Sequence, residues 1–322
     1  MTDTKPNVIC AGHINWDVTM HVDKLPEPDG EVQIRELIQS GGGSAANVAV
    51  GLSGLDADAT VFGSVGGDDS GAFALQELDR SGVQCGHVLV AKDETTAVKY
   101  LVVDDDGEVM VFASDGANEA FSAGDLPPRV VATADHLHLT SQRPETAVEL
   151  AALVRDVGGT VSFDPGRRVG QRAFKRAFPH VDVLFCNRRE AELAAEDYRE
   201  NGPDDGLLVT KRGADGATVS APKGTVSHPG FEIDAVDTTG SGDAFAAGFL
   251  AAWLGSRTFR RRFRRDGGAA GPDVGSDGSD DPPLEEVLAV ANACGALTAM
   301  EATARTDLTW DRVASLVEKT EE

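Results

Sequence analysis

Short apolar runs alternate with longer amphipathic segments along most of the chain. From residue 135 onward the alternation is regular, with apolar runs at 136–139, 160–164, 181–186 and 207–211, and helical patterns at 144–157 and 169–178. Apolar runs of this length, bounded by turn residues, are typical of strands buried on both faces. Runs at 8–12 and 60–65 predict two more such strands, and the patterns at 44–55, 72–80, 284–300 and 308–317 predict helices. Strand–helix alternation of this kind predicts a doubly wound parallel sheet.

Two stretches interrupt this alternation with β-like patterns. Residues 18–40 alternate loosely and contain Pro26, Pro28 and Gly30, which predicts two strands joined by a turn. Residues 97–103 and 108–113 flank the sequence D-D-D-G, a hairpin signature. We expect both stretches to form a small sheet apart from the main body, a lid made of residues 14–40 and 95–115.

Composition limits the classes of partner. The 322 residues carry 29 basic and 53 acidic side chains, a net charge of −24, which argues against nucleic acid and anionic membranes as partners. So acidic a surface, with few lysines, is typical of a chain kept soluble in concentrated salt, and we expect a halophilic source. Four scattered cysteines predict buried thiols without metal spacing, and the chain shows neither a membrane-length apolar run nor a signal peptide, so we expect a cytoplasmic protein.

The clearest break in composition follows residue 257. Residues 266–283 consist of Gly, Asp, Ser and Pro with almost no apolar side chains, and R-R-R-F-R-R precedes them at 260–265. We predict a flexible insertion at about 258–283. The arginine cluster is interpreted as a solvated helix end; contact with a nucleotide phosphate or with a neighbouring subunit is the alternative.

The stretch that carries the most chemistry is A-V-D-T-T-G-S-G-D-A-F-A-A-G at 235–248. A turn of small residues runs there directly into an apolar helix, which predicts that the N–H groups of Gly240, Ser241, Gly242 and Asp243 converge at the positive end of the helix dipole. An anion is expected at that point, and the carboxylate of Asp243 beside it suggests a catalytic base. Ordinary helix capping is the alternative for this turn.

Further polar residues are predicted near the ends of strands. Asn15 and Asp17 alternate with apolar neighbours and would share one face, which suits neighbouring sugar hydroxyls. Asn47 follows three glycines at a helix start, where a ligand can approach closely. Asn187 and Glu190 lie three residues apart at a strand-to-helix turn: either Glu190 orients water around Mg²⁺ with Asn187 near phosphate oxygens, or the two cap the helix. The rest of the polar side chains expected at this edge of the sheet are Thr140, Gln142, Asp164, Arg167 and Arg168.

Four separated motifs, in the same order, resemble the ribokinase-like (PfkB) sugar kinases. D-T-T-G-S-G-D is similar to the D-T-x-G-A-G-D signature of that family, and S-G-G-G-S-A-A-N, F-C-N-R-R-E and V-T-K-R-G-A-D-G are similar to its remaining motifs. The resemblance implies a three-layer α/β/α sandwich with a β lid, a single kinase domain over residues 1–322, ATP as phosphoryl donor and Mg²⁺ as cofactor.

Carried over residue by residue, the resemblance makes Asp243 the base that takes the proton of a substrate hydroxyl. It places the transferring phosphoryl group in an anion hole of Gly240, Ser241 and Gly242. The expected sugar ligands are Asn15, Asp17, Gly43, Asn47, Gln142 and Arg167. The expected nucleotide ligands are Asn187, Lys211, Gly213, Gly216 and Asn292. Glu190 is assigned to Mg²⁺, and Asp237 to a monovalent cation such as K⁺.

Departures from the family pattern bear on the acceptor. Ser44 and Ala45 stand where ribokinases usually have lysine, and Gln142 stands where they often have glutamate, which disfavours free ribose. A furanose, ribosyl or fructosyl, remains the leading expectation. Arg143, Arg167 and Arg168 could clamp a phosphate already present on the sugar, since guanidinium binds phosphate bidentately. Surface ion pairing in an Asp-rich protein is the alternative for these arginines. A nucleoside kinase is an alternative. A catalytically silent sugar-binding regulator is another, but the intact D-T-T-G-S-G-D and N-x-x-E motifs argue against it. We expect a homodimer formed through the lid.

Overall fold

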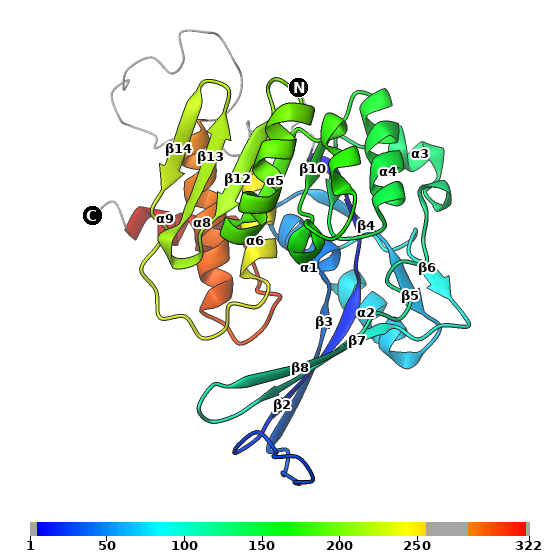
Figure 1. The fold of residues 1–322 in the computed structure, drawn as a ribbon, viewed down its shortest axis with the longest axis vertical. Coiled ribbons are helices and arrows are strands. Elements are labelled where there is room, and N and C mark those ends of the chain that lie inside the picture. The colour runs from blue at the N-terminus through cyan, green and yellow to red at the C-terminus, as the bar shows by residue number, and fades with distance from the viewer. Residues whose placement is uncertain (1–4, 256–282, 320–322) are drawn as a thin grey trace.

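Alternate residues of the first strand, β1 (Asn7–Ala11), enter two different apolar clusters. Val8 and Cys10 lie in a cluster with helices from the first and last parts of the chain, whereas Ile9 and Ala11 lie in a second cluster with helices from its middle part. Because successive side chains of a strand point to opposite faces, this division places helices on both faces of the sheet. The architecture is therefore the expected three-layer α/β/α sandwich (Figure 1).

The structure is a computed structural model that describes residues 5–255 and 283–319. The central sheet has eight strands in the order β14-β13-β12-β11-β10-β9-β1-β4. Neighbouring strands run parallel from β12 to β4, and the β12-β13-β14 edge is antiparallel. These strands are β1, β4 (Asp58–Phe62), β9 (His136–Leu139), β10 (Thr160–Phe163), β11 (Val183–Asn187), β12 (Leu207–Lys211), β13 (Ala217–Ala221) and β14 (Gly224–His228).

The helices connect and cover these strands. The α-helices described are α1 (Ser44–Gly54), α2 (Asp69–Arg80), α3 (Pro128–Val131), α4 (Pro144–Asp156), α5 (Arg188–Asn201), α6 (Ser241–Leu254), α8 (Leu284–Ala299) and α9 (Trp310–Lys319). Short 3-10 turns lie at η1 (Ala123–Asp125), η2 (Gly166–Arg168), η3 (Phe174–Arg176), η4 (Phe178–His180) and η5 (Gly213–Asp215). None of the helices within the described ranges is long and apolar enough to cross a membrane.

The predicted lid sheet is present. It has four strands in the order β3-β2-β7-β8, namely β2 (Asn15–His21), β3 (Glu36–Gly42), β7 (Ala97–Val103) and β8 (Val109–Ser114). The D-D-D-G turn joins β7 to β8, where Gly107 N donates to Asp104 O. Figure 1 shows this sheet projecting away from the body of the molecule.

Two predicted elements differ from the structure. The helix expected at 169–178 is wrong: the segment folds as 3-10 turns that bury Phe174 and Phe178 against the second cluster. Gly170 disfavours a helix, and Pro179 stands inside the next turn. The strand expected at 60–65 is broken at Gly63 into β4 and β5 (Ser64–Gly66), and β5 pairs with a short strand, β6 (Leu89–Ala91). A Cβ at Gly63 would lie 2.3 Å from Gly12 O, so the chain passes there at a distance that only glycine permits.

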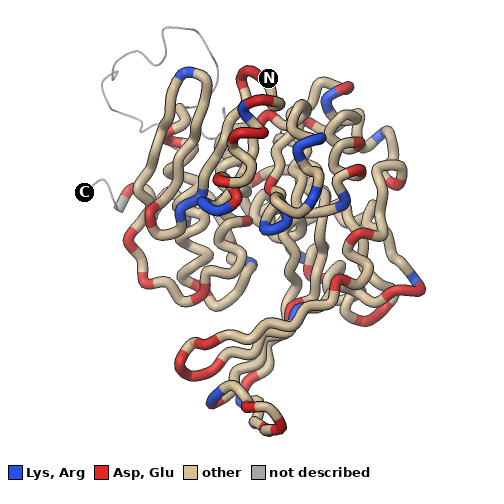
Figure 2. Tube along the Cα trace, viewed as in Figure 1, with Lys and Arg blue, Asp and Glu red and all other residues tan. Residues whose placement is uncertain are grey.

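Charge is spread over the whole surface. Figure 2 shows acidic positions along the helices and loops of the body and in the turns at the far end of the lid, with basic positions fewer between them. The expected insertion at 258–283, apart from residue 283, and the arginine cluster at 260–265 lie outside the described residues.

Candidate active site

The turn before α6 has the geometry of an anion site. Gly240 caps the helix in the left-handed conformation, with φ of 76°, and a Cβ there would lie 2.3 Å from Ala304 O. Ser241 N already donates to Thr238 O and Asp243 N to Gly240 O, so the expectation that four N–H groups converge freely is wrong for these two. Within the described residues Gly240 N and Gly242 N have no such partner, and these two groups remain for a ligand.

Asp243 lies in the first turn of α6, and among the described residues Asn47 is the one whose side chain hydrogen-bonds to its carboxylate. Its Oδ2 accepts from Asn47 Nδ2 at 2.9 Å. Burial raises the pKa of Asp243 to about 6, while the bond from Asn47 and the charges of Lys211 and Lys99 oppose that rise. A carboxyl group that titrates close to neutral pH is suited to general-base catalysis.

The orientation of Asn47 is fixed by Arg305, a residue that the sequence motifs do not include. Arg305 Nε donates to Asn47 Oδ1 at 3.0 Å, which leaves the amide nitrogen of Asn47 facing Asp243. The guanidinium also donates to Glu77 Oε1 and Gly42 O, and the side chain is only 7% exposed. Arg305 stands in the sequence E-A-T-A-R-T, which carries no motif or periodicity that would have signalled this role.

Lys211 lies at the carboxyl end of β12, close to the same turn. Its Nζ is 2.5 Å from Asp164 Oδ2, and a Cβ at Gly242 would lie 3.3 Å from that nitrogen. Burial disfavours the ammonium ion, but Asp164, with Asp243 and Glu190, gives a net rise in the pKa of Lys211. The sequence assigned Lys211 to the nucleotide, and the structure brings its charge to the anion turn and the base.

Asn187 and Glu190 cap α5 reciprocally. Asn187 Oδ1 accepts from Glu190 N at 2.9 Å, and Glu190 Oε2 accepts from Asn187 N at 2.8 Å, so the capping alternative describes the observed geometry. Burial raises the pKa of Glu190 and Asp164 adds to this effect, while Lys211 and Arg167 oppose it. Glu190 is thereby brought near the acidic and basic groups around Lys211.

The predicted cation residues do not form a protein cage. Asp237 Oδ1 accepts from Thr239 N at 2.8 Å and from Thr239 Oγ1 at 2.7 Å, and so braces the turn that leads to Gly240. Across the described residues no group of three or more His, Cys, Asp or Glu side chains could hold a metal ion. Mg²⁺ bound mainly by substrate phosphates needs only one or two carboxylates, and Glu190 with Asp164 fits that requirement.

The remaining nucleotide residues lie in two places. Gly213 and Gly216 shape the turn between β12 and β13, with φ of 63° and 75°, and Arg212 N donates to Gly216 O across it. Asn292 is buried in α8, where its Nδ2 donates to Leu288 O at 2.7 Å. The assignment of these three residues to the nucleotide stays a prediction.

The residues expected to bind the sugar gather where the lid joins the body, and their assignment to the sugar stays a prediction. Asn15 begins β2 opposite Gly42, and its Oδ1 accepts from Asn118 Nδ2 at 2.9 Å. Asp17 is buried beneath Gly42, where a Cβ would lie 2.3 Å from Asp17 Oδ2, and Asp17 Oδ1 has no hydrogen-bond partner among the described residues. Gly43 caps α1 with φ of 95°, where a side chain would collide with His13 O. Asn15, Asp17 and Gly43 therefore lie together near Asn47.

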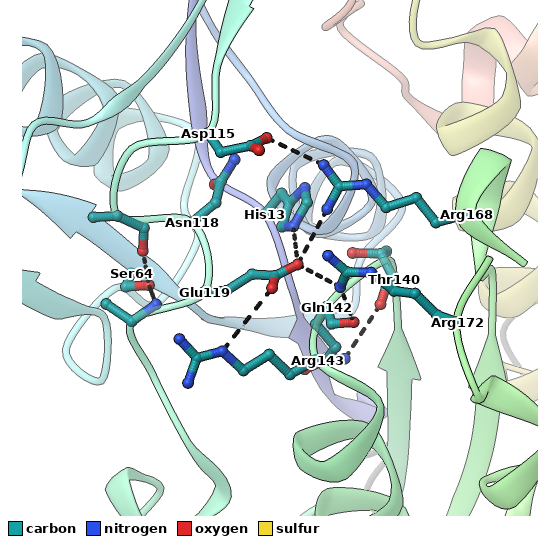
Figure 3. A network of polar contacts seen from close by, with 12 residues as sticks. His13, Ser64, Asp115, Asn118, Glu119, Thr140, Gln142, Arg143, Arg168 and Arg172 are labelled. Carbon is teal, nitrogen blue, oxygen red and sulfur yellow. Dashed lines mark hydrogen bonds and ion pairs between the residues drawn. The ribbon is translucent and has the colours of Figure 1, made fainter.

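Two more predicted sugar residues are placed differently. Gln142 is fully buried, and its Nε2 donates to Ala11 O and Thr140 O at 3.3 Å. Arg167 is exposed and its charge acts on Glu190, so it lies toward the nucleotide residues. The arginines that gather around Glu119 are Arg143, Arg168 and Arg172 (Figure 3).

Comparisons with known proteins identify the family of the chain. Residues 5–311 match the model of the pfkB family carbohydrate kinases. The chain is 49% identical to an "ATP-dependent ribose-1-phosphate kinase" of the halophile Halopiger xanaduensis, over 96% of this chain and 97% of that protein. It is 29% identical to a "Nucleoside kinase" of Methanothermobacter thermautotrophicus, over 77% of this chain and 82% of that protein.

Solved structures show the same fold. The structure of Arabidopsis thaliana ribokinase complexed with ribose and ATP has a TM-score of 0.80 at 20% identity, with 98% of this chain and 99% of that chain covered. The nucleoside kinase of Methanocaldococcus jannaschii has a TM-score of 0.76 at 24% identity, with 97% and 98% covered. The expected fold and kinase activity are thus confirmed, and the expected halophilic source matches that of the Halopiger relative. The chain belongs to the pfkB family of carbohydrate kinases, ATP-dependent phosphotransferases with an alcohol group as acceptor.

Proposed function

We propose that this kinase transfers the γ-phosphoryl group of ATP to the free primary hydroxyl of ribose 1-phosphate. The observation that carries the proposal is the 49% identity, over nearly the full length of both chains, to a protein named for that activity. The cluster of Arg143, Arg168 and Arg172 around Glu119 supports it, because guanidinium groups bind phosphate with charge-assisted hydrogen bonds. The neighbour of Glu119, Asn118, donates to Asn15. A sugar phosphate is thereby preferred over a free furanose as the acceptor.

The chemistry is an in-line displacement. Asp243 accepts the proton of the hydroxyl, the hydroxyl oxygen forms a bond to the γ-phosphorus, and the bond to the β,γ-bridging oxygen breaks to release ADP. Gly240 N, Gly242 N and the Lys211 ammonium ion lie where they stabilise the charge on the transferring group. Mg²⁺, held by the nucleotide phosphates with Glu190 and Asp164, would neutralise phosphate charge, and a monovalent cation near Asp237 would support the turn.

The proposal is tested by measuring ADP release with a panel of acceptors. We expect kcat/KM for ribose 1-phosphate to exceed that for ribose, ribose 5-phosphate, fructose and adenosine, and ³¹P NMR to identify ribose 1,5-bisphosphate as the product. A higher kcat/KM for a free sugar or a nucleoside would contradict the proposal. Tight binding of these ligands without turnover would instead support the silent regulator.

We also propose that two copies of the chain associate through their lids. Leu37, Tyr100 and Phe112 lie on one face of the lid and are 49%, 43% and 55% exposed, and Val111 on the opposite face is 55% exposed. Large apolar side chains exposed together are typical of an interface. Phe112→Asp is expected to convert a dimer to a monomer in light scattering, whereas Leu153→Asp on the exposed side of α4 is not; a wild-type monomer at assay concentration would refute the proposal.

The expected location is the cytoplasm. All four cysteines are free thiols, as is usual in a reducing compartment. Nucleic acid and membranes are not expected as partners, because the net charge is −24.

A further inference from the structure

Glu119 stands at the centre of a group of cationic side chains next to the sugar residues. Its Oε1 accepts from Arg172 Nη1 at 2.6 Å and from Arg168 Nη1 at 3.2 Å, and its Oε2 lies 4.0 Å from Arg143 Nε. His13 Nε2 lies 3.6 Å from the same Oε1 (Figure 3). His13 and Arg172 hold the pKa of Glu119 at about 2, against the opposing effect of its partial burial, so Glu119 is ionised at any physiological pH.

A cavity opens beside this carboxylate. It has a volume of about 180 Å³ and is lined by His13, Asp115, Gly116, Asn118, Glu119, Arg168 and Arg172. At about 30 Å³ per water molecule, this volume accommodates roughly six waters, which is room for a phosphoryl group. The buried His13 Nε2 makes no hydrogen bond within the described part of the chain and has only its 3.6 Å approach to Glu119 Oε1, so it is available to a ligand when that carboxylate moves away.

The cavity is connected to the sugar residues by direct contacts. Asn118 lines it and donates to Asn15 Oδ1, while Asn118 Oδ1 accepts from Ile14 N at 3.3 Å. The proposed acceptor carries its phosphate at the end of the sugar opposite to its primary hydroxyl. A sugar that directs this hydroxyl toward Asp243 and contacts Asn15 therefore has its phosphate on the side of Arg168.

From these contacts we propose that Glu119 is an internal occupant of a phosphomonoester site, and that the phosphate of the acceptor exchanges with its carboxylate on Arg168, Arg172 and His13. This inference deepens the proposed function, on which it rests. A phosphomonoester carries a charge of about −1.5 to −2 at pH 7 and three acceptor oxygens, whereas the carboxylate offers one charge and two oxygens. The phosphate therefore makes the stronger set of contacts with two guanidinium groups.

The backbone around Glu119 is fixed, so the exchange needs only a side-chain rotation. A Cβ at Gly116 would lie 2.4 Å from Thr95 O, which shows how closely this loop packs on the start of β7. Ser64 Oγ donates to Ala117 O, and Ala120 N donates to Ser64 Oγ. Arg143, near Glu119 Oε2 and 59% exposed, is positioned to pair with the displaced carboxylate.

The site therefore selects against unphosphorylated sugars. A free sugar leaves Glu119 paired with the arginines and gains nothing from them, while a phosphorylated sugar replaces that pair with stronger contacts. Small monoanions compete poorly, because Glu119 is tethered beside the site at a high effective concentration.

The test is the binding of inorganic phosphate by calorimetry, with a non-hydrolysable ATP analogue present so that nucleotide fills the anion turn before α6. We expect Glu119→Gln to bind inorganic phosphate at least about tenfold more tightly than wild type, because the competing carboxylate is gone. Arg168→Gln should bind it at least about tenfold more weakly. Glu145→Gln, which removes the partner of the exposed Arg176, is the matched control and should leave the affinity unchanged.

Kinetics give the second readout. Glu119→Gln should lower the ratio of KM for ribose 1-phosphate to KM for ribose, and Arg168→Gln should raise it. If Glu119→Gln melts like wild type but binds phosphate no more tightly, the inference is overturned. If its phosphate affinity rises while wild type fails to phosphorylate ribose 1-phosphate, the anion site is supported and the proposed acceptor is refuted.

Discussion

The contact between Asn47 and Asp243 predicts how the pH dependence of the kinase responds to mutation. Asp243 must be ionised to accept a proton, and its pKa is about 6, so kcat/KM should fall tenfold per pH unit below about pH 6. Asn47→Ala removes the hydrogen bond that Asp243 Oδ2 accepts from Asn47 Nδ2, and that bond favours the ionised form of Asp243. The acidic limb of the profile should therefore move to higher pH.

The size of the shift follows from the strength of that bond. A hydrogen bond to a charged group contributes about 1.5–3 kcal/mol, and one pKa unit corresponds to about 1.36 kcal/mol. The limb should move up by about one to two units. Asp164→Asn should shift the limb in the opposite direction. The charge of Asp164 raises the pKa of Asp243, so its loss should move the acidic limb to lower pH.

The assay is kcat/KM for the acceptor from pH 5 to pH 9 at saturating ATP, with ADP release coupled to a reporter enzyme. Titration of ATP and of a phosphorylated acceptor affects every variant equally, so only the displacement from wild type is used. The reasoning is refuted if Asn47→Ala leaves the limb unmoved, or if both variants displace it in the same direction.

Three further predictions concern the same site. Asp243→Asn should retain at most about a thousandth of kcat, and it should be more stable than wild type at pH 7. In the folded wild type the pKa of Asp243 is raised from 3.8 to about 6, so the protein loses about 3 kcal/mol of stability as pH rises through that window, at about 1.36 kcal/mol per pKa unit. Urea melts of both proteins at pH 7 and pH 4 would measure this difference. Gly240→Ala should lower kcat and stability together, because a Cβ would collide with a backbone carbonyl. Gly158→Ala is the control: φ is 86° there and nothing lies within 4 Å, so the free energy of unfolding should fall by only about 1–2 kcal/mol. Equal melting temperatures for the two variants would contradict this account. Arg305→Gln should move the acidic limb in the direction of Asn47→Ala, and the double variant should move it no further; additive shifts would show that Arg305 acts independently of Asn47.

Local patterns in the sequence were enough to predict the elements and the turn at Gly240. The strands around β1 are short apolar runs bounded by turn residues, and burial on both faces leaves that signal intact. The turn before α6 is specified within nine residues, because its glycines, Thr239 and Asp243 are adjacent in the chain. The lid hairpin could be predicted for the same reason, since Gly107 and the strands that flank it are contiguous in the sequence.

Contacts between distant segments could not be predicted. Arg305 meets Asn47 across 258 positions of sequence, and Glu119 meets Arg172 across 53, so neither contact leaves a spacing to detect. The segment at 169–178 shows the limit of periodicity, because Phe174 and Phe178 have helical spacing yet are buried from two separate 3-10 turns. A difference of one position also decided which arginine joins Glu119, as Arg168 lies beside it and Arg167 does not.

Arg305 also has a consequence for the order in which the protein becomes active during synthesis. The strands of the central sheet, the lid and the base itself all precede residue 244. The guanidinium that fixes the amide of Asn47 leaves the ribosome about 60 residues later, after α8. A nascent chain therefore acquires a recognisable sheet well before it can phosphorylate anything, and a protein truncated ahead of position 305 would keep its base without the group that orients it.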